Sequence, residues 1–196
     1  MKNDYETDSS QDSSSSDDLR LVPPPHVPSD LTISESLDFR VTGLAGDRLL
    51  FDGYTLSWLG SSPASFIGFS GMADESAKES VKDIGPTPQG KYAVDPANIE
   101  ILVPSDDWGE HRVKLEPYKE TVTRMSDCFK VIRTGMYIHG GTFTGTHGCI
   151  ELNDDADEAA FFKKLKDYGK KIELEVSYVS DRENITRIRD VLIRRI

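Results

Sequence analysis

Two histidines and a cysteine share one short glycine-rich stretch, residues 133–152, which reads RTGMYIHGGTFTGTHGCIEL. A cysteine is a strong nucleophile only as its thiolate, so it needs a base within hydrogen-bond reach. His139 ends an apolar run, and the chain returns to Cys149 ten positions later. Glycines beside the cysteine let backbone N–H groups converge on a developing oxyanion. The pattern predicts a covalent site with Cys149 as nucleophile and His139 as base.

The same side chains permit other interpretations. Cys149 could be an inert core thiol, because buried cysteines are common, and His139 a strand-end histidine without chemistry. With His147 they are three candidate zinc ligands, but the spacing matches no familiar zinc signature and a thiolate between glycine-rich turns suits covalent catalysis better. We therefore expect no metal and no cofactor, with His147 in a supporting catalytic position. Cys128 is interpreted as a buried small hydrophobic residue.

Short strands and turns must position this stretch. Asp52-Gly53 is a strong two-residue hairpin signal, and prolines and glycines at 85–90 mark another turn. Segment 72–84 is either a short helix or a loop over a cleft, and 120–124 is ambiguous. The expected strands cover residues 48–51, 54–58, 65–69, 91–94, 98–103, 111–115, 129–132 and 136–138.

One helix follows the stretch. Asn153 or Asp154 can cap it, acidic residues suit the positive end of its dipole, and Gly169 can end it. Residues 172–178 then alternate between apolar and polar side chains, as in a half-buried strand. These signals predict a mainly β fold with one or two helices.

The two ends of the chain differ from its middle. Residues 1–30 are rich in Ser, Asp and Pro, with too little apolar surface to offset ordering entropy, so we expect a disordered acidic tail. Residues 181–196 place apolar side chains at helical spacing among five arginines, which predicts a basic amphipathic helix packed on the domain or a partner, with membrane contact as the alternative. Residues 31–180 can form one domain with its own core.

Charge and hydropathy limit the partners. The formal net charge is −11, whereas nucleic acids and anionic membranes call for a basic face. No apolar run approaches the length of a transmembrane helix, and the first residues lack the apolar segment of a signal peptide. We expect no nucleic-acid partner, no membrane span and no export by the general secretory route.

The residues around His139 and Cys149 resemble the L,D-transpeptidase (YkuD-type) catalytic domain. That family carries a His-Gly element followed by [Ser/Thr]-x-Gly-Cys and a hydrophobic residue, which this chain matches at 138–141 and 146–150. The likeness is closer to a short-loop branch that includes peptidoglycan-targeting effectors of type VI secretion systems. Weaker motifs at 69–71, 85–92 and 108–117 extend it.

The resemblance implies a mixed β-sandwich or barrel-like fold and an acyl-enzyme on Cys149, formed from a peptidoglycan stem peptide. The implied roles are the general base for His139, catalytic support for His147, the oxyanion hole for the N–H groups of Gly148 and Cys149, orientation of the imidazole for the Gly140 carbonyl, and substrate binding for Arg133 and Thr146. Arg133 is equally a candidate for an ion pair.

The chain departs from the family pattern at three points. Glu151 stands where many members have Arg two positions after the cysteine, so the substrate-binding role of that Arg does not carry over. The connection between His139 and Cys149 is shorter than usual. Met136 stands where an aromatic residue is common.

The acyl-enzyme allows two outcomes, transfer to an amine (L,D-transpeptidase) or to water (L,D-carboxypeptidase), and both stay open. The alternatives are a cysteine peptidase or amidase that cuts another stem-peptide bond, and a non-catalytic wall-binding module. Peptidoglycan lies outside the cytoplasmic membrane, so we expect a secreted antibacterial effector that reaches the periplasm of a target cell by a non-classical route. A secretion carrier and a cognate immunity protein are its expected partners.

Overall fold

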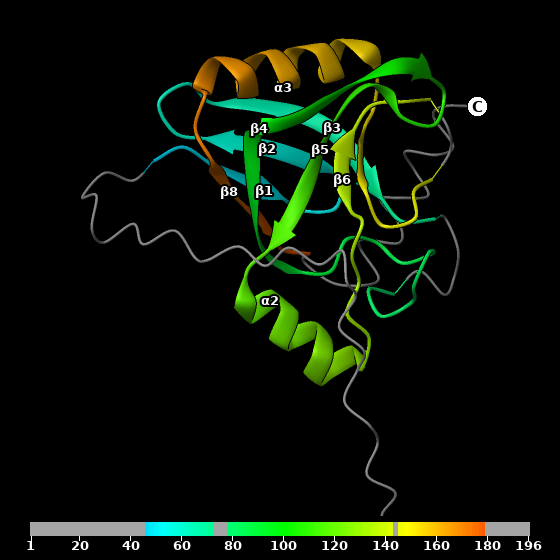
Figure 1. Ribbon diagram of the computed structural model, residues 1–196. Helices are drawn as coiled ribbons and strands as arrows, with labels where there is room; N and C mark the ends of the chain where they lie inside the picture. The colour runs from blue at the N-terminus through cyan, green and yellow to red at the C-terminus, as the bar shows by residue number, and fades with distance from the viewer. Residues whose placement is uncertain (1–45, 73–77, 143–144, 179–196) are drawn as a thin grey trace, which may run out of the picture.

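A computed structural model describes residues 46–72, 78–142 and 145–178 of the 196-residue chain. Within these ranges, eight strands close into one barrel and two α-helices lie against it (Figure 1). The predicted acidic tail, 1–30, and the predicted basic helix, 181–196, lie outside the described residues. The strands are β1 (Arg48–Phe51), β2 (Thr55–Leu59), β3 (Ala64–Ser70), β4 (Gly90–Ser105), β5 (Gly109–Pro117), β6 (Tyr137–His139), β7 (Ile150–Leu152) and β8 (Ile172–Val176).

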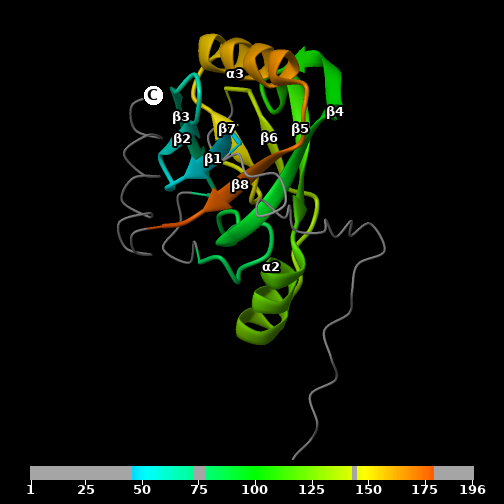
Figure 2. The same ribbon diagram turned by 90° about the vertical axis from the view of Figure 1, so that its left-hand side faces the viewer.

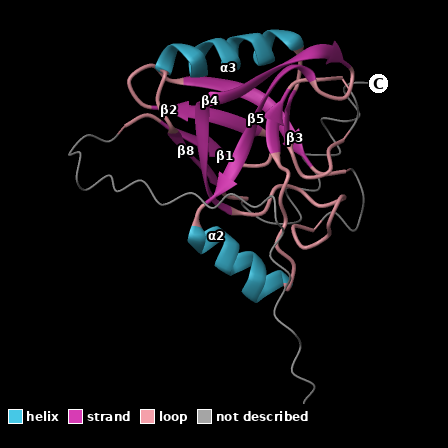
Figure 3. Cartoon of the chain, viewed as in Figure 1, coloured by secondary structure: helices cyan, strands magenta, loops and turns pink. Residues whose placement is uncertain are grey.

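The strands follow the order β1-β2-β3-β7-β6-β5-β4-β8 around the barrel. The pairs β1–β8 and β6–β7 are parallel, and the other neighbours are antiparallel. The colouring by secondary structure in Figure 3 shows how strands dominate the domain. The predicted mainly β fold with one or two helices is confirmed, and it takes the form of a closed barrel.

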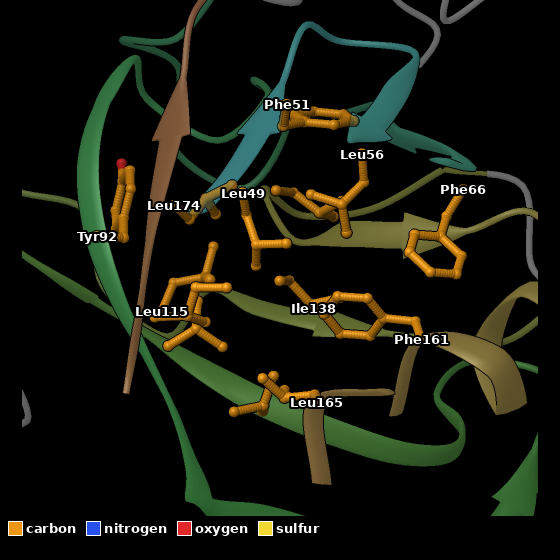
Figure 4. Close-up of a cluster of buried hydrophobic side chains, with 14 of the residues drawn as sticks. Leu49, Phe51, Leu56, Phe66, Tyr92, Leu115, Ile138, Phe161, Leu165 and Leu174 are labelled. Atoms are coloured by element: carbon orange, nitrogen blue, oxygen red, sulfur yellow. The ribbon is translucent and has the colours of Figure 1, made fainter. Parts of the chain in front are cut away.

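Alternating apolar residues of the strands fill the barrel (Figure 4). Helix α3 (Asp155–Tyr168) lies across one end, and α2 (Lys119–Arg124) lies beyond the other, as Figure 1 and Figure 2 both show. Phe161, Phe162 and Leu165 of α3 are buried and belong to the same core. Burial of large apolar side chains is the dominant favourable contribution to such a fold. The helix therefore closes the core.

The structure confirms several local predictions. Asp154 caps α3 by accepting a hydrogen bond from the Asp157 N–H (2.8 Å), and Gly169 ends the helix in the left-handed conformation. Strands β1 and β2 form the predicted hairpin, but the pairing of Phe51 with Leu56 makes its turn longer than two residues. Asp52 closes that turn with its own carboxylate, which accepts two backbone N–H groups.

Other predictions need correction. The strands expected at 91–94 and 98–103 are one strand, β4, with a register shift between Val94 and Ile99 where four residues of β4 lie opposite one residue of β5. The ambiguous segment 120–124 is helical and forms most of α2. It runs into a π-helical turn, η1 (Met125–Phe129), in place of the strand expected at 129–132.

The η1 turn also places Cys128. Its Met125 faces the interior and is fully buried, while Cys128 is exposed. Lys130 adopts a left-handed conformation that ends the turn, so the following apolar residues pair with no strand. The prediction of a buried Cys128 was therefore wrong, because a short apolar run does not reveal which face of a helical turn meets the core.

Candidate active site

The parallel pairing of β6 with β7 brings the two candidate catalytic residues together. Ile138 pairs with Ile150, and His139 pairs with Glu151. Both isoleucines are fully buried in the barrel core. Since successive strand residues face opposite sides, His139 lies on the outer side of the wall, and so does Cys149 just before β7. The two are diagonal neighbours across adjacent strands, positions whose long side chains can reach one another.

A backbone carbonyl orients the His139 ring. Its Nδ1 forms a short hydrogen bond with the carbonyl oxygen of Gly140. A carbonyl only accepts, so Nδ1 carries the hydrogen, and in the neutral ring Nε2 is the unprotonated nitrogen. The ring is 3% exposed and lies 4.9 Å, centroid to centroid, from Trp108. The predicted contact between imidazole and Gly140 carbonyl is confirmed, and it gives the tautomer that a general base needs.

Cys149 is a protonated thiol in this environment. Its side chain is 5% exposed, and its Sγ contacts the Gly135 carbonyl at 3.9 Å. Burial raises its pKa to about 11, against smaller opposing effects of the Tyr137 N–H and of the Arg133 and Arg112 charges. A base must therefore take the thiol proton before attack, which is the part that His139 can play.

Thr146 is the centre of the loop that precedes Cys149. Its hydroxyl accepts from the Gly71 N–H (2.9 Å), donates to the Cys149 carbonyl (2.7 Å) and lies 3.3 Å from the Gly148 N–H. Serine and threonine hydroxyls often close turns in this way. The Thr146 hydroxyl and the Gly148 N–H are thus engaged inside the loop, and their substrate-binding and oxyanion roles stay predictions.

Arg133 is a buried scaffold residue. It is 3% exposed, and its guanidinium donates to the backbone carbonyls of Glu79, Gly85, Pro86 and His147 at 2.6–3.3 Å. It ties segment 79–86 to the loop before Cys149. Its hydrogen-bond partners are backbone carbonyls rather than a carboxylate, and a substrate-binding role for Arg133 stays a prediction. The carbonyls come from distant segments, and no local sequence signal indicates them.

His147 occupies the outer side of the loop. His147 is exposed, and its backbone carbonyl accepts a hydrogen bond from the Arg133 guanidinium. Across the parts of the chain that the structure describes, no three His, Cys, Asp or Glu side chains gather as metal ligands. A catalytic role for His147 stays a prediction.

Glu158 of α3 supports the His139 loop from behind. It is 3% exposed, and its Oε1 accepts from the N–H groups of Glu110 (2.9 Å) and His111 (2.7 Å). Its other oxygen packs against Gly140, where a Cβ would lie 1.7 Å from it. A cavity of about 430 Å³ beside Glu158 and Gly141 does not include Cys149 in its lining.

An aromatic and cationic cluster beside His139 had no predicted role. The Arg112 guanidinium lies 4.8 Å from the Trp108 ring centroid and 4.7 Å from that of Tyr137. The two rings meet edge to face at 5.8 Å. On β5 the buried residues Val113 and Leu115 alternate with polar ones, and this alternation is the sequence signal that puts Arg112 on the outer face of the strand.

Comparison with known proteins adds no family. A scan of the sequence against protein-family models finds no match, and a search of curated proteins finds no relative. Neither helix in the described ranges is long and apolar enough to cross a bilayer. The likeness to L,D-transpeptidases therefore rests on the motifs alone.

Proposed function

We propose that the protein is a cysteine-dependent L,D-transpeptidase or L,D-carboxypeptidase acting on peptidoglycan stem peptides. One observation supports the proposal: the parallel pairing of β6 and β7 puts Cys149 on the strand next to that of His139, two positions before its pairing partner, and the Gly140 carbonyl holds Nδ1 of the imidazole. The motif resemblance supplies the substrate class. The geometry supplies a nucleophile, a base and an orienting group, the minimum for acyl transfer.

The reaction would proceed in two halves. His139 Nε2 takes the proton from Cys149 Sγ. The sulfur attacks the carbonyl at the L-centre of the diamino acid, the third residue of the stem peptide. The tetrahedral intermediate collapses, the C–N bond breaks, and the imidazolium gives its proton to the leaving D-residue nitrogen. An acceptor amine or water then attacks the thioester while His139 takes the new nucleophile's proton. Collapse expels the sulfur, which regains a proton from the imidazolium.

The decisive test is product analysis of stem peptides. Purified protein is incubated with disaccharide tetrapeptides, with and without an added D-amino acid, and products are identified by mass. We expect loss of the terminal D-residue or its exchange. Cys149→Ala should abolish both, and Cys128→Ala, a change at an exposed thiol, should abolish neither.

The enzyme alternative predicts different products. A cysteine amidase or peptidase would release fragments cut beside the D-glutamyl residue, and finding only those would refute the proposal. Activity that survives Cys149→Ala would refute covalent catalysis by Cys149. Binding to peptidoglycan with no product from the native chain would favour a wall-binding module.

The proposed site of action is the periplasm of a target cell. Expression in a bacterial host with an added periplasmic signal should lyse the cells, whereas expression without it should not. Cys149→Ala should remove lysis. Toxicity confined to the cytoplasm would contradict a peptidoglycan substrate.

A further inference from the structure

Four outward residues form a row across neighbouring strands of the barrel. Glu100 of β4 pairs with Arg112 of β5, Arg112 pairs with His139 of β6, and His139 pairs with Glu151 of β7. Cys149 lies diagonally beyond His139 on the β7 side. The order across the wall is therefore nucleophile, base and guanidinium, each about 4.8 Å from the next strand.

The Arg112 guanidinium is held in place, but not all of its N–H donors have a partner in the described ranges. Its guanidinium contacts the Trp108 and Tyr137 rings, so its orientation is set. Nε and Nη2 both donate to a single oxygen of Glu100, at 3.0 and 2.7 Å. Nη1 has no hydrogen bond to any residue in the described ranges, and the side chain is 26% exposed. A planar guanidinium with unused N–H groups is suited to a second carboxylate.

The other cation near the thiol is engaged elsewhere. Arg133 and Arg112 are the two cations whose charges act on Cys149. Arg133 is buried, and within the described part of the chain it donates to backbone carbonyls. Position 151, two residues after the nucleophile, holds a buried glutamate. Arg112 is thus the cation placed to meet an anionic substrate group.

The order of groups matches the order of atoms in a substrate. The scissile carbonyl must lie at Sγ and the leaving nitrogen at His139, so the leaving residue extends from His139 toward β5. One residue spans about 3.5 Å, which a long arginine side chain on the next strand can meet. We propose that Arg112 binds the free carboxylate of the terminal D-residue, an assignment that rests on the proposed function. This contact makes the enzyme specific for a residue that carries a free C-terminal carboxylate.

Binding to an inactivated protein tests this assignment directly. In the Cys149→Ala background, calorimetry compares a stem tetrapeptide that ends in a carboxylate with its C-terminal carboxamide. We expect the acid to bind about tenfold to a hundredfold more tightly, as for a charge-assisted pair. Adding Arg112→Gln should remove the preference, and Arg112→Lys should retain part of it. Arg48→Gln, a matched change at an exposed arginine on β1, should retain all of it.

The same comparison in the active protein separates the possible failures. If the Cys149 enzyme releases no D-residue from either peptide, the proposed function is wrong and the assignment falls with it. If it releases the residue and Arg112→Gln keeps the acid preference, only the Arg112 assignment is overturned. Glu100→Gln provides a fold control: it breaks the ion pair but leaves the stacked guanidinium, so the preference should persist. If Glu100→Gln removes the acid preference as Arg112→Gln does, the Glu100–Arg112 ion pair is structural and the Arg112 assignment is overturned.

Discussion

Cys149 rests as a thiol because burial raises its pKa to about 11. The starting state of the nucleophile is thus the thiol rather than the thiolate. Such a cysteine is protected from chance oxidation, since reactivity follows the thiolate fraction.

The alkylation rate of Cys149 should report this state. In a Cys128→Ser background, which removes the exposed thiol, labelling by iodoacetamide should be slow at pH 7 and rise about tenfold per pH unit toward pH 11. Mass spectrometry of quenched samples gives the rate. A plateau already reached near neutral pH would instead indicate a thiolate paired with protonated His139.

Thr146 should be as important for stability as for activity. Thr146→Val keeps the shape but leaves the buried Gly71 N–H and Cys149 carbonyl without their partner. We expect a loss of about 2–3 kcal/mol in the free energy of unfolding. The control, Thr142→Val, removes an exposed contact with Asp106 and should cost less than about 0.5 kcal/mol. Urea unfolding measures both, and equal losses would contradict the role of Thr146.

At the scale of elements, α3 does more than close the barrel. It caps the core with its phenylalanines and sends Glu158 to the β5 backbone and to the back of Gly140. Gly140 in turn orients His139. The helix thereby supports the base through contacts that touch no substrate, so we regard Glu158 as a positioning residue.

Replacing Glu158 should affect both stability and the base. Glu158→Ala leaves two partly buried N–H groups of β5 without this acceptor, which should cost about 1–3 kcal/mol. Asp167→Ala changes a carboxylate of the same helix that is 65% exposed, and should cost less than about 0.5 kcal/mol. Unfolding curves give the costs. At a temperature where Glu158→Ala stays folded, turnover should still fall, and unchanged turnover would confine Glu158 to stability.

The folded barrel buries polar groups as well as apolar ones, and burial changes how they titrate. Tyr178 donates its hydroxyl hydrogen to the Thr87 carbonyl at 2.8 Å, and burial raises its pKa well above 10. The folded protein therefore keeps this proton at a pH where the unfolded chain loses it. Its contribution to stability is full below pH 10 and declines above it, by about 1.4 kcal/mol per pH unit.

Tyr178→Phe should make the protein less sensitive to alkali. At pH 7 the variant loses one hydrogen bond, about 1 kcal/mol. Above pH 10 its free energy of unfolding should fall less steeply than that of the native chain, by about 1.4 kcal/mol per pH unit, so the two curves converge. Urea titrations at pH 7, 10 and 11 measure the difference. Parallel curves would mean that the hydroxyl titrates alike in both states.

The features determined by sequence alone are local. The hairpin around Asp52-Gly53, the caps of α3 and the residue types at His139 and Cys149 follow from neighbours a few positions apart. Strand alternation also predicts a mainly β fold. These signals suffice because each depends on backbone preferences within one turn or strand.

Tertiary structure decided how these pieces meet. The β6–β7 register, the carbonyls around Arg133 and the exposed side of η1 depend on segments far apart in the chain. Arg112 joins the site through cross-strand pairing with His139. Local preferences do not specify such pairings, because register is set by burying one whole face of each strand against the rest of the core.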